Sequence, residues 1–592
     1  MEPIKVDFTG GGDNTKGTGK NAYLIPEKSG LKMIISIIGT VIGAAVAYYF
    51  MLPPLNFKST DTYMFIGVVA AIFVGLLFIT SGAFIKPEYT EYVKRRSIAS
   101  IVVIAILVAI VGVGMAFSTV VFRAKTYSNI IDVNENTSFA NDIEEADFSA
   151  VPVLDDAAAG VLANRTLGDL ASINAISQFE VSNQMTQINY KNEPVKVTTL
   201  AYGDVFKWLK NTRAGLPGYV VVNMVTQKAE LKILPEGEYI QYSVHEHFGK
   251  YLMRHIRFAY PTYIFDTPHF EIDEEGNPFW LCPVLDKTIG LFGGTDVKGV
   301  VIVDAVSGDM VEYTAEEVKS SKELQWIDGI YSKDLLVEQF NYYGQYKNGF
   351  INSLIGQDGV KLATEGSNFL AQNDDVYLYT GVTSAGNDQA IIGFVLINMR
   401  TKDASFYSVS GAKERSAQSS AQGEVQDYAY AATFPILLNI SGEPTYFMSL
   451  KDRDNLVKRY AMVNVENYQV VVTGTTIAEC TDAYVKKLKQ NNINIDVDID
   501  KIEDATNNSG EATDTPETET EKVKVKGTVT DIRTAVMGGE SVYFIEIDDK
   551  GVYYSIEASD NAAVVILNKG DTVTVTVDAD AEGDIVEAIS IK

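Results

Sequence analysis

Three stretches of the chain hold no Asp, Glu, Lys, Arg or His: Met33 to Met51, Tyr63 to Ile85 and Ser97 to Phe122. Each is long enough to cross about 30 Å of hydrocarbon at about 1.5 Å per residue. Buried helices of a soluble domain would also be apolar, but three such runs in close succession, separated by short charged loops, favour membrane spans. The sequence therefore predicts three transmembrane helices within residues 33–122.

The basic residues around these spans predict their orientation, because Lys and Arg resist translocation. The tail 1–32 holds five lysines, and the loop after the second span holds Lys86, Lys94, Arg95 and Arg96. The loop after the first span holds only Lys58. With three spans, the tail and the second loop share one side. We therefore expect a multi-pass protein of the cell membrane, with residues 1–32 cytoplasmic and everything after the third span extracytoplasmic.

Charge excludes several classes of protein. The chain of 592 residues has 49 basic and 77 acidic side chains, a net charge of −28. Residues 1–122 hold 10 basic and 7 acidic side chains, a net of +3, which leaves 39 and 70, a net of −31, for the remainder. Such a polyanion would repel nucleic acid, and its acidity is typical of a soluble exported domain. Two Cys and four His exclude a disulfide framework and a multi-zinc protein.

Small residues recur at four-residue spacing in the spans: Gly39 and Gly43 in the first, and Gly67, Ala71 and Gly75 in the second. This spacing lets helix backbones approach closely. It predicts packing either among the three spans or between copies of the chain in a homo-oligomer. No charged side chain falls at mid-membrane, so the spans are interpreted as an anchor in the lipid bilayer.

Four segments beyond the spans repeat one pattern: an apolar strand, an Asn or Asp, a short polar turn and a second strand. The Asn or Asp suits the start of a turn, because its side chain bonds to nearby backbone N–H groups. The segments are 218–231, 299–313, 393–407 and 460–472, and their turn residues are Asn223, Asp304, Asn398 and Asn464. The repetition predicts tandem modules.

A helix and an earlier hairpin precede the later copies. Helical patterns cover Val244 to Phe258, Lys333 to Leu354 and the segment after Lys413; strands are expected from Phe270 to Leu281, around Phe369, from Val376 to Val382 and from Pro435 to Leu450. A helix packed on the apolar face of four antiparallel strands gives a compact α+β layer. We therefore expect a connector over 123–190 and tandem α+β modules over 191–496.

This plan resembles the PepSY-type (cystatin-like) module of exported bacterial proteins, and Val301 to Gly308 is its nearest local match. The whole arrangement is also similar to uncharacterised membrane proteins of Gram-positive bacteria. The resemblance implies an envelope location, with other envelope proteins as partners. It also implies an alternative function, in which PepSY-like modules regulate or inhibit an envelope peptidase.

The amino-acid composition of the chain changes near residue 496. Residues 497–521 are rich in Thr, Glu, Asp and Asn and are predicted to be a flexible acidic linker. Residues 522–592 hold five stretches of alternating β-formers, which fit a small five-stranded barrel. The region 522–592 resembles an OB-fold, with Asn568 to Asp571 before a strand. Its 7 basic and 13 acidic residues disfavour nucleic acid, so its aromatic residues are expected in the core or in protein contacts: Tyr543, Phe544, Tyr553 and Tyr554.

Candidate chemistry is confined to four histidines between residues 245 and 269: His245, His247, His255 and His269. No Cys neighbours them and no HExxH spacing is present, so solvated or core histidines are favoured over a metal site. Cys282 and Cys480 could pair outside the cytoplasm or simply fill the core. The sequence thus predicts no catalytic, metal-binding or cofactor-binding residue and no cofactor. The preferred function is non-enzymatic: an extracytoplasmic binding or scaffolding protein of the envelope.

Overall fold

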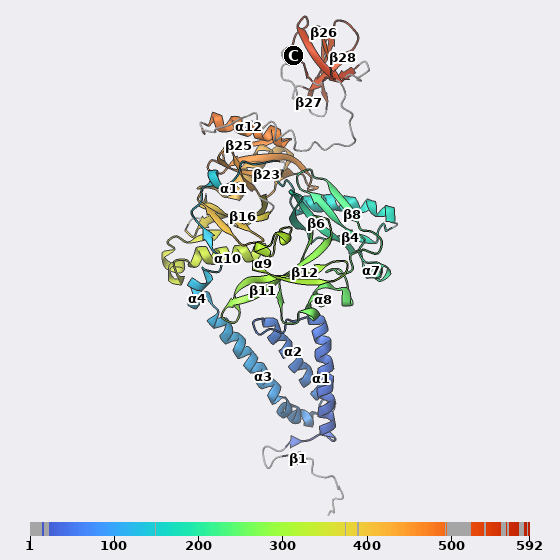
Figure 1. Ribbon diagram of the computed structural model, residues 1–592, viewed down its shortest axis with the longest axis vertical. Helices are drawn as coiled ribbons and strands as arrows, with labels where there is room; N and C mark the ends of the chain where they lie inside the picture. The colour runs from blue at the N-terminus through green and yellow to red at the C-terminus, as the bar shows by residue number, and fades with distance from the viewer. Residues whose placement is uncertain are drawn as a thin grey trace, which may run out of the picture. The chain divides into compact units, whose positions relative to one another are not determined.

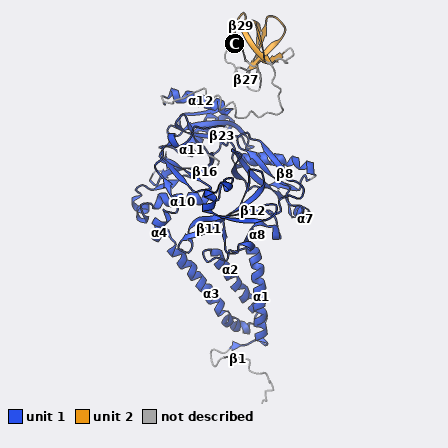
Figure 2. Ribbon diagram, in the orientation of Figure 1, with its two compact units in different colours: residues 1–510 blue, residues 511–592 orange. Residues whose placement is uncertain are grey.

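A computed structural model describes residues 15–16, 23–148, 150–173, 175–372, 375–386, 390–491, 493, 522–537, 540–557, 564, 567–578, 585–588 and 590–591. The chain divides into two compact units, residues 1–510 and 511–592 (Figure 2). The predicted linker 497–521 lies outside the described residues. So does most of the predicted tail 1–32 before Tyr23, apart from β1 (Thr15–Lys16), which pairs with β2 (Tyr23–Leu24).

Three helices of the first unit are long and apolar enough to cross a membrane: α1 (Ser29–Met51), α2 (Thr60–Ser81) and α3 (Thr90–Phe117). This confirms the prediction of three helices that are long and apolar enough to span a membrane. In Figure 1 they gather at one end of the unit, next to β11, β12 and α8. A Cβ atom on Gly39 or Gly43 would lie 2.9 Å from Leu76 or Ile72, so the first pair of small residues brings α1 and α2 together. Gly67 and Gly75 face open space instead.

The predicted end of the third span is wrong. The expected run to Phe122 breaks after Phe117, and a separate helix α4 (Val120–Tyr127) follows. Ser118, between the two helices, accepts the backbone N–H groups of Leu291 and Phe292 at 3.0 and 3.1 Å. The Tyr127 hydroxyl donates to the Ser118 carbonyl at 2.6 Å. These tertiary bonds to a distant hairpin end the helix, and the apolar sequence alone gives no sign of them.

The body of the first unit contains four antiparallel sheets built on one plan. In each, a long third strand pairs on one side with two short strands that precede it and on the other with the fourth strand, which then pairs with the fifth. Sheet 1 comprises β4 (Phe179–Val181), β5 (Thr186–Tyr190), β6 (Glu193–Tyr202), β7 (Gly218–Asn223) and β8 (Ala229–Ile233). Sheet 2 comprises β9 (Ile264–Phe265), β10 (His269–Ile272), β11 (Pro278–Ile289), β12 (Gly293–Asp304) and β13 (Met310–Thr314).

The other two sheets repeat this plan. Sheet 3 comprises β14 (Lys361–Ala363), β15 (Asn368–Gln372), β16 (Asp375–Ser384), β18 (Gly393–Asn398) and β19 (Ala404–Tyr407), to which β3 (Val133–Asn134) adds in parallel. Sheet 4 comprises β21 (Ala431–Ala432), β22 (Ile436–Ile440), β23 (Glu443–Lys451), β24 (Val457–Asn464) and β25 (Val471–Gly474). A separate pair joins β17 (Ala390–Ile391) to β20 (Gly411–Ala412).

The four predicted hairpins are the last two strands of the four sheets, and their turn residues act as expected. The Asn223 side-chain oxygen accepts the N–H groups of Val225 and Thr226 at 2.9 and 2.8 Å. The corresponding side chains of Asp304, Asn398 and Asn464 also accept backbone N–H groups of their turns. The repeated Asn or Asp therefore fixes the fold locally.

The helices of the body depart from the predicted repeat in three places. The helix expected from Lys333 to Leu354 ends at Tyr346, and Gly349, with a φ of 89°, separates it from a π-helical turn over Asn352–Gly356. The expected helix from Val244 to Phe258 forms only in its second half, as α8 (Leu252–Ala259), because Phe248 has a φ of 50° and Tyr251 is extended. The range 123–190 is expected from the sequence to be a connector, but it holds α6 (Asp156–Arg165), β4 and β5. The helix α6 packs on β7 and β8. The remaining helices are α5 (Phe139–Asp142), α7 (Val205–Asn211), α9 (Ala315–Ser320), α10 (Lys333–Tyr346), α11 (Glu414–Glu424) and α12 (Ile477–Gln490).

The sheets share their cores. Along β12, Val301 and Val303 pack into the core that joins sheets 1, 2 and 4, whereas Val300 and Ile302 pack into the core that joins sheets 2 and 3. A strand that is covered on both faces must be apolar at successive positions. The modules are thus fused side to side and do not form separate domains.

The body is hydrogen-bonded to the end of α1 and to the segment between α1 and α2. Arg254 and Arg257 of α8 donate to the carbonyls of Tyr49 and Leu52 at the end of α1, at 3.2 and 3.0 Å. Cations at this position also complement the negative end of the helix dipole. Lys58, between α1 and α2, lies 2.8 Å from Asp286 of β11. The segment between α1 and α2 is therefore fixed against sheet 2.

The second unit contains one sheet with the strand order β30-β28-β27-β26-β29-β31. Its strands are β26 (Lys522–Met537), β27 (Glu540–Ile547), β28 (Tyr553–Glu557), β29 (Thr572–Asp578), β30 (Ile585–Glu587) and β31 (Ser590–Ile591). β30 pairs with β28 at one edge and β31 with β29 at the other, so the last segment of the chain bridges both edges. Tyr554 is buried, Tyr543 packs against the core and Phe544 is half-buried. Tyr553 donates to Asp531 at 2.9 Å.

Candidate functional site

The four histidines that the sequence singled out lie in separate surroundings. His245 bonds to Ser182, His255 to the carbonyl of Gly308 and His269 to the carbonyl of Gly329, each at 2.8 Å. The ring of His247 packs edge-on against Trp208, with centroids 4.6 Å apart. Among the described residues, no three His, Cys, Asp or Glu side chains are grouped so as to hold a metal ion. Only His245 and His247 share a pocket.

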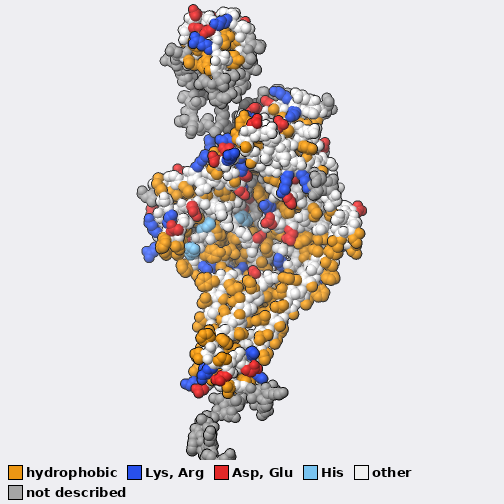
Figure 3. Space-filling model, turned by 180° about the vertical axis from the view of Figure 1, so that it is seen from behind, with side chains coloured by type: hydrophobic (Ala, Val, Ile, Leu, Met, Phe, Trp, Pro, Cys, Tyr) orange, Lys and Arg blue, Asp and Glu red, His pale blue; other side chains and the backbone are white. Residues whose placement is uncertain are grey.

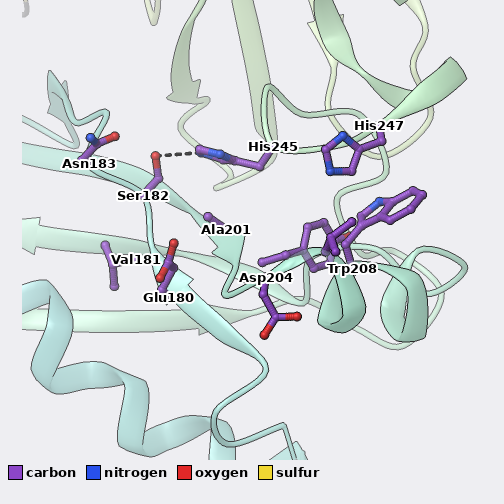
Figure 4. Close-up of a pocket in the computed structure, with 11 residues that line it drawn as sticks. Glu180, Val181, Ser182, Asn183, Ala201, Asp204, Trp208, His245 and His247 are labelled. Carbon is purple, nitrogen blue, oxygen red and sulfur yellow. Dashed lines mark hydrogen bonds between the residues drawn. The ribbon is translucent and has the colours of Figure 1, made fainter.

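This first pocket, the Ser182 pocket, has a volume of about 390 Å³ and lies between the ends of β4 and β6, α7 and the loop that carries both histidines. Figure 4 shows Ser182 facing His245, with His247 beside Trp208 and the carboxylates of Glu180 and Asp204 at the opposite wall. Ser182 follows β4 directly, and its hydroxyl oxygen also accepts the N–H of Gln184 at 3.2 Å. The serine therefore belongs to a local turn as well as to the pocket.

The Ser182–His245 pair has the geometry of a nucleophile and its base. Burial lowers the pKa of His245, against the opposing charge of Glu180, so the neutral imidazole can accept the serine proton. Within the described residues, however, no carboxylate hydrogen-bonds to this imidazole, and Ser182 is only 4 % exposed. A hydrolase needs an oriented base and an accessible nucleophile. The pair serves equally well as a tie between β4 and the histidine loop.

A buried carboxylate lies beneath the Ser182 pocket. Glu246 is 2 % exposed, accepts the Trp208 indole N–H at 2.8 Å and also accepts the Tyr202 hydroxyl. Burial, together with this carboxylate, raises the pKa of Tyr202. Each oxygen of Glu246 thus has its own donor, and the carboxylate joins α7 to β6. The polar groups around this pocket are satisfied by one another.

A second space, the central cavity, opens where sheets 1, 2 and 3 meet. Its volume is about 430 Å³, and its walls come from β5, β6, β10 and β11, the segment 328–333, and β15 and β16. The walls are mainly apolar, with contributions from Met185, Tyr331 and Phe369. Polar groups reach it at a few points, among them Gln187, Lys196, His269 and Glu271. A largely apolar space of this size with a few placed polar groups is typical of a small-ligand site.

Two buried polar atoms at the central cavity lack hydrogen-bond partners. Glu271 is 1 % exposed; its Oε2 accepts the N–H of Asp328 at 3.2 Å, but its Oε1 receives no hydrogen bond. The Nε2 of His269 lies 3.1 Å from this oxygen, an ion-pair distance when the imidazole is protonated, and it also bonds to the Gly329 carbonyl at 2.8 Å. Gln187 is 9 % exposed, and its Nε2 donates to nothing. An unpaired buried polar atom costs about 1–3 kcal/mol, so such atoms call for an explanation.

His269 adds a titratable group to this cavity. Burial lowers its pKa, but the Glu271 carboxylate and the Gly329 carbonyl outweigh burial, and the net effect is a raised pKa. Its side chain is 26 % exposed, on the second strand of sheet 2. Lys196, which also lines this cavity, is 4 % exposed and forms an ion pair with Asp156. It therefore forms no ion pair with the Glu271 carboxylate.

Comparison of the chain with models of known protein families and with curated proteins finds no match. The function is therefore inferred from the geometry of these two pockets.

Both cysteines are free and fully buried, Cys282 in β11 and Cys480 in α12. Burial raises the pKa of Cys282 and raises that of Cys480 to about 12. Thiols held in the protonated form are poor nucleophiles and poor metal ligands. Of the two alternatives that the sequence left open, the structure has the core position and not the disulfide.

Sequence reasoning missed Glu271 and Gln187. The only signal was an acidic residue between two apolar ones, Phe270 and Ile272, in a predicted strand. On a strand with one solvated face this alternation is ordinary. Glu271 becomes unusual only because the opposite module covers that face.

Proposed function

We propose that the protein is a non-enzymatic, membrane-anchored binding protein of the cell envelope. Its cytoplasmic tail would lie inside and its body outside, as the distribution of Lys and Arg favours. In this proposal the central cavity is the binding site. The observation that carries the proposal is that Glu271 Oε1 and Gln187 Nε2, both buried and both without hydrogen-bond partners, line one cavity of about 430 Å³.

The unpaired atoms indicate what the ligand must supply. Glu271 Oε1 needs a hydrogen-bond donor, and Gln187 Nε2 needs an acceptor. A peptide group offers an N–H and a C=O together, and a peptide also carries side chains for the apolar wall around Met185, Tyr331 and Phe369. The ligand we propose is therefore a short segment of polypeptide, free or part of a partner protein.

The test measures thermal unfolding of the full chain in lipid nanodiscs with a mixture of random tripeptides and, separately, with a mixture of disaccharides. A ligand that binds only the folded state at ten times its Kd adds about 1.4 kcal/mol, which raises Tm by about 1 °C in a chain of this size. We expect this rise with the peptides, its loss in Glu271→Gln and Gln187→Leu, and its retention in Ser182→Ala at the other pocket. No rise with peptides, or an equal rise in Glu271→Gln, would contradict the proposal.

A second candidate is regulation of an envelope peptidase. It is supported by the fourfold repetition of one strand plan, which fits the resemblance to PepSY-type, cystatin-like modules. In the same way, the bridging segment Ile585 to Ile591 supports an OB-like barrel at the C-terminus. Crosslinking of the full chain in cells separates the candidates. One peptidase recovered in equal amount would favour regulation, whereas recovery of the chain itself would favour a homo-oligomeric scaffold.

A further inference from the structure

Two groups of large apolar side chains are exposed on the body of the first unit. The α7 patch comprises Val205, Phe206 and Leu209, which are 52, 77 and 57 % exposed, with Phe248 and Phe258 beside them. The 351–355 patch comprises Ile351, Leu354 and Ile355, which are 73, 62 and 83 % exposed. Figure 3 shows apolar side chains gathered on both flanks of the body next to the helices and continuous with the helix surfaces. Exposed apolar groups of this density mark an interaction surface.

A short series of contacts joins the α7 patch to the end of α1. The ring of Phe258 stacks on that of Tyr48 in the last turn of α1, with centroids 6.0 Å apart. The Phe248 carbonyl accepts a hydrogen bond from Arg254, which also donates to the Tyr49 carbonyl of α1. Trp208 of α7 packs on Phe248 at 5.8 Å. Trp208, Phe248 and Arg254 thus connect α7 to the end of α1.

The 351–355 patch has an equivalent connection to α3. Tyr127 of α4 bonds to Ser118 at the end of α3 and packs on Tyr342 at 4.6 Å. Tyr342 stacks on Tyr346, and Tyr346 stacks on Phe350, at 6.2 and 6.3 Å. Phe350 immediately precedes the patch. The two patches therefore flank the group of three helices, one beyond α1 and the other beyond α3.

Local charge suits a membrane surface on the α7 side. Although the chain after residue 122 carries a net charge of −31, Lys207, Lys210 and Arg213 lie in or just after α7. Lys210 and Arg213 are exposed. An apolar face flanked by basic side chains is typical of elements that lie in the headgroup region, where the apolar groups enter and the cations meet lipid phosphates. Trp208, bonded to the buried Glu246, holds α7 so that its other apolar residues face outward.

From this continuity with the spans and this local charge, we infer that the α7 patch and the 351–355 patch insert into the boundary between headgroups and acyl chains of the leaflet that faces the body. The body then lies on the bilayer and does not stand clear of it. The partner is the lipid surface itself. The inference does not depend on which side of the membrane holds the body or on what the central cavity binds.

The test places single spin labels on the full chain in nanodiscs of phosphatidylcholine and phosphatidylglycerol at three to one. Cys282 and Cys480 are buried, so labels will attach to introduced cysteines: Phe206→Cys and Leu354→Cys in the patches, and Ser419→Cys as the control. Ser419 is exposed on α11, on the side of the body away from the three helices (Figure 1). Each label's collision rate with oxygen, which concentrates in lipid, is compared with its rate with a water-soluble nickel chelate.

We expect the ratio of oxygen to nickel collisions at positions 206 and 354 to exceed the ratio at position 419 several-fold. All three positions are exposed, so the substitutions leave the fold intact and a failure to fold does not confuse the result. A ratio at either patch equal to that of the control would show water around that patch and would overturn the inference for it. Equal ratios at all three positions would overturn it altogether.

Discussion

The Ser182 pocket and the central cavity have similar volumes. A buried glutamate lies beneath the first and in the wall of the second, and the two glutamates differ in their hydrogen bonds. Glu246 beneath the first pocket accepts one hydrogen bond on each oxygen, from Tyr202 and Trp208. Glu271 at the second has one oxygen without a donor. A buried carboxylate with all its partners holds the fold together, whereas one without them costs stability that a ligand can restore. The contrast teaches that the pocket with the more catalytic residue types is the less promising binding site.

The largest expected effect comes from Glu246→Gln. An amide keeps one acceptor but turns its NH2 toward a donor, so one of Tyr202 and Trp208 loses its partner. We expect the free energy of unfolding to fall by about 2–4 kcal/mol, measured by urea unfolding followed through tryptophan fluorescence. Glu180→Gln is the control, because Glu180 lines the same pocket but is exposed. A loss no greater than that of the control would mean that Glu246 does not hold α7 to β6.

Ser182→Ala should have a smaller effect, of about 1 kcal/mol, because it removes the hydrogen bonds with His245 and Gln184. Hydrolysis of p-nitrophenyl acetate should be the same in the variant as in the parent chain. If the parent hydrolyses the ester and the variant does not, Ser182 is a nucleophile. The pocket would then be catalytic, and the proposed non-enzymatic function would be wrong.

The two histidines should give the pockets opposite responses to pH. The pKa of His245 in the folded chain lies below its ordinary value of 6.5, so the unfolded chain binds more protons and stability falls as the pH falls through 6.5. The pKa of His269 lies above 6.5, so its contribution is complete below pH 6.5 and is lost as the pH rises through the raised value. Unfolding measured between pH 5 and 8 should therefore show less loss at acidic pH in His245→Gln and less loss at alkaline pH in His269→Gln. Changes of the same sign in both variants would refute the contrast.

The smallest effect is expected from Glu271→Gln, the exact counterpart of Glu246→Gln in chemistry. The amide oxygen can still accept the N–H of Asp328, and the atom that is replaced accepts no hydrogen bond, although it lies 3.1 Å from His269 Nε2. The free energy of unfolding should change by less than about 1 kcal/mol. A loss as large as that in Glu246→Gln would mean that Glu271 is fully paired in the folded protein, and the argument for a ligand would fail.

Much of the fold could be predicted from the sequence where local patterns determine it. The first two spans follow from uninterrupted apolar runs, and the four hairpins follow from Asn223 and its equivalents, whose side chains bond within three residues. The end of α3 could not be predicted, because Phe122 is as apolar as Phe117 and only the bonds of Ser118 to Leu291 and Phe292 stop the helix.

The site was less predictable than the fold. The histidines form a cluster in sequence, yet His245 and His269 face different pockets, because the break at Phe248 and the start of β10 separate them. The central cavity draws Gln187, Glu271 and Phe369 from three modules. These residues are close together because whole sheets pack on shared cores. A short stretch of sequence does not predict that packing.

β11 extends from the central cavity to the hairpin that bonds to Ser118, and its pairing with β12 is irregular between Val284 and Leu285. Trp280 and Pro283 line the cavity near one end of this strand. Ile289 lies at the other end, next to the hairpin whose N–H groups bond to Ser118. A β-bulge bends its strand and interrupts the ladder. The irregular step at Val284 and Leu285 therefore lies between the residues of β11 that line the cavity and the end of the strand that meets Ser118.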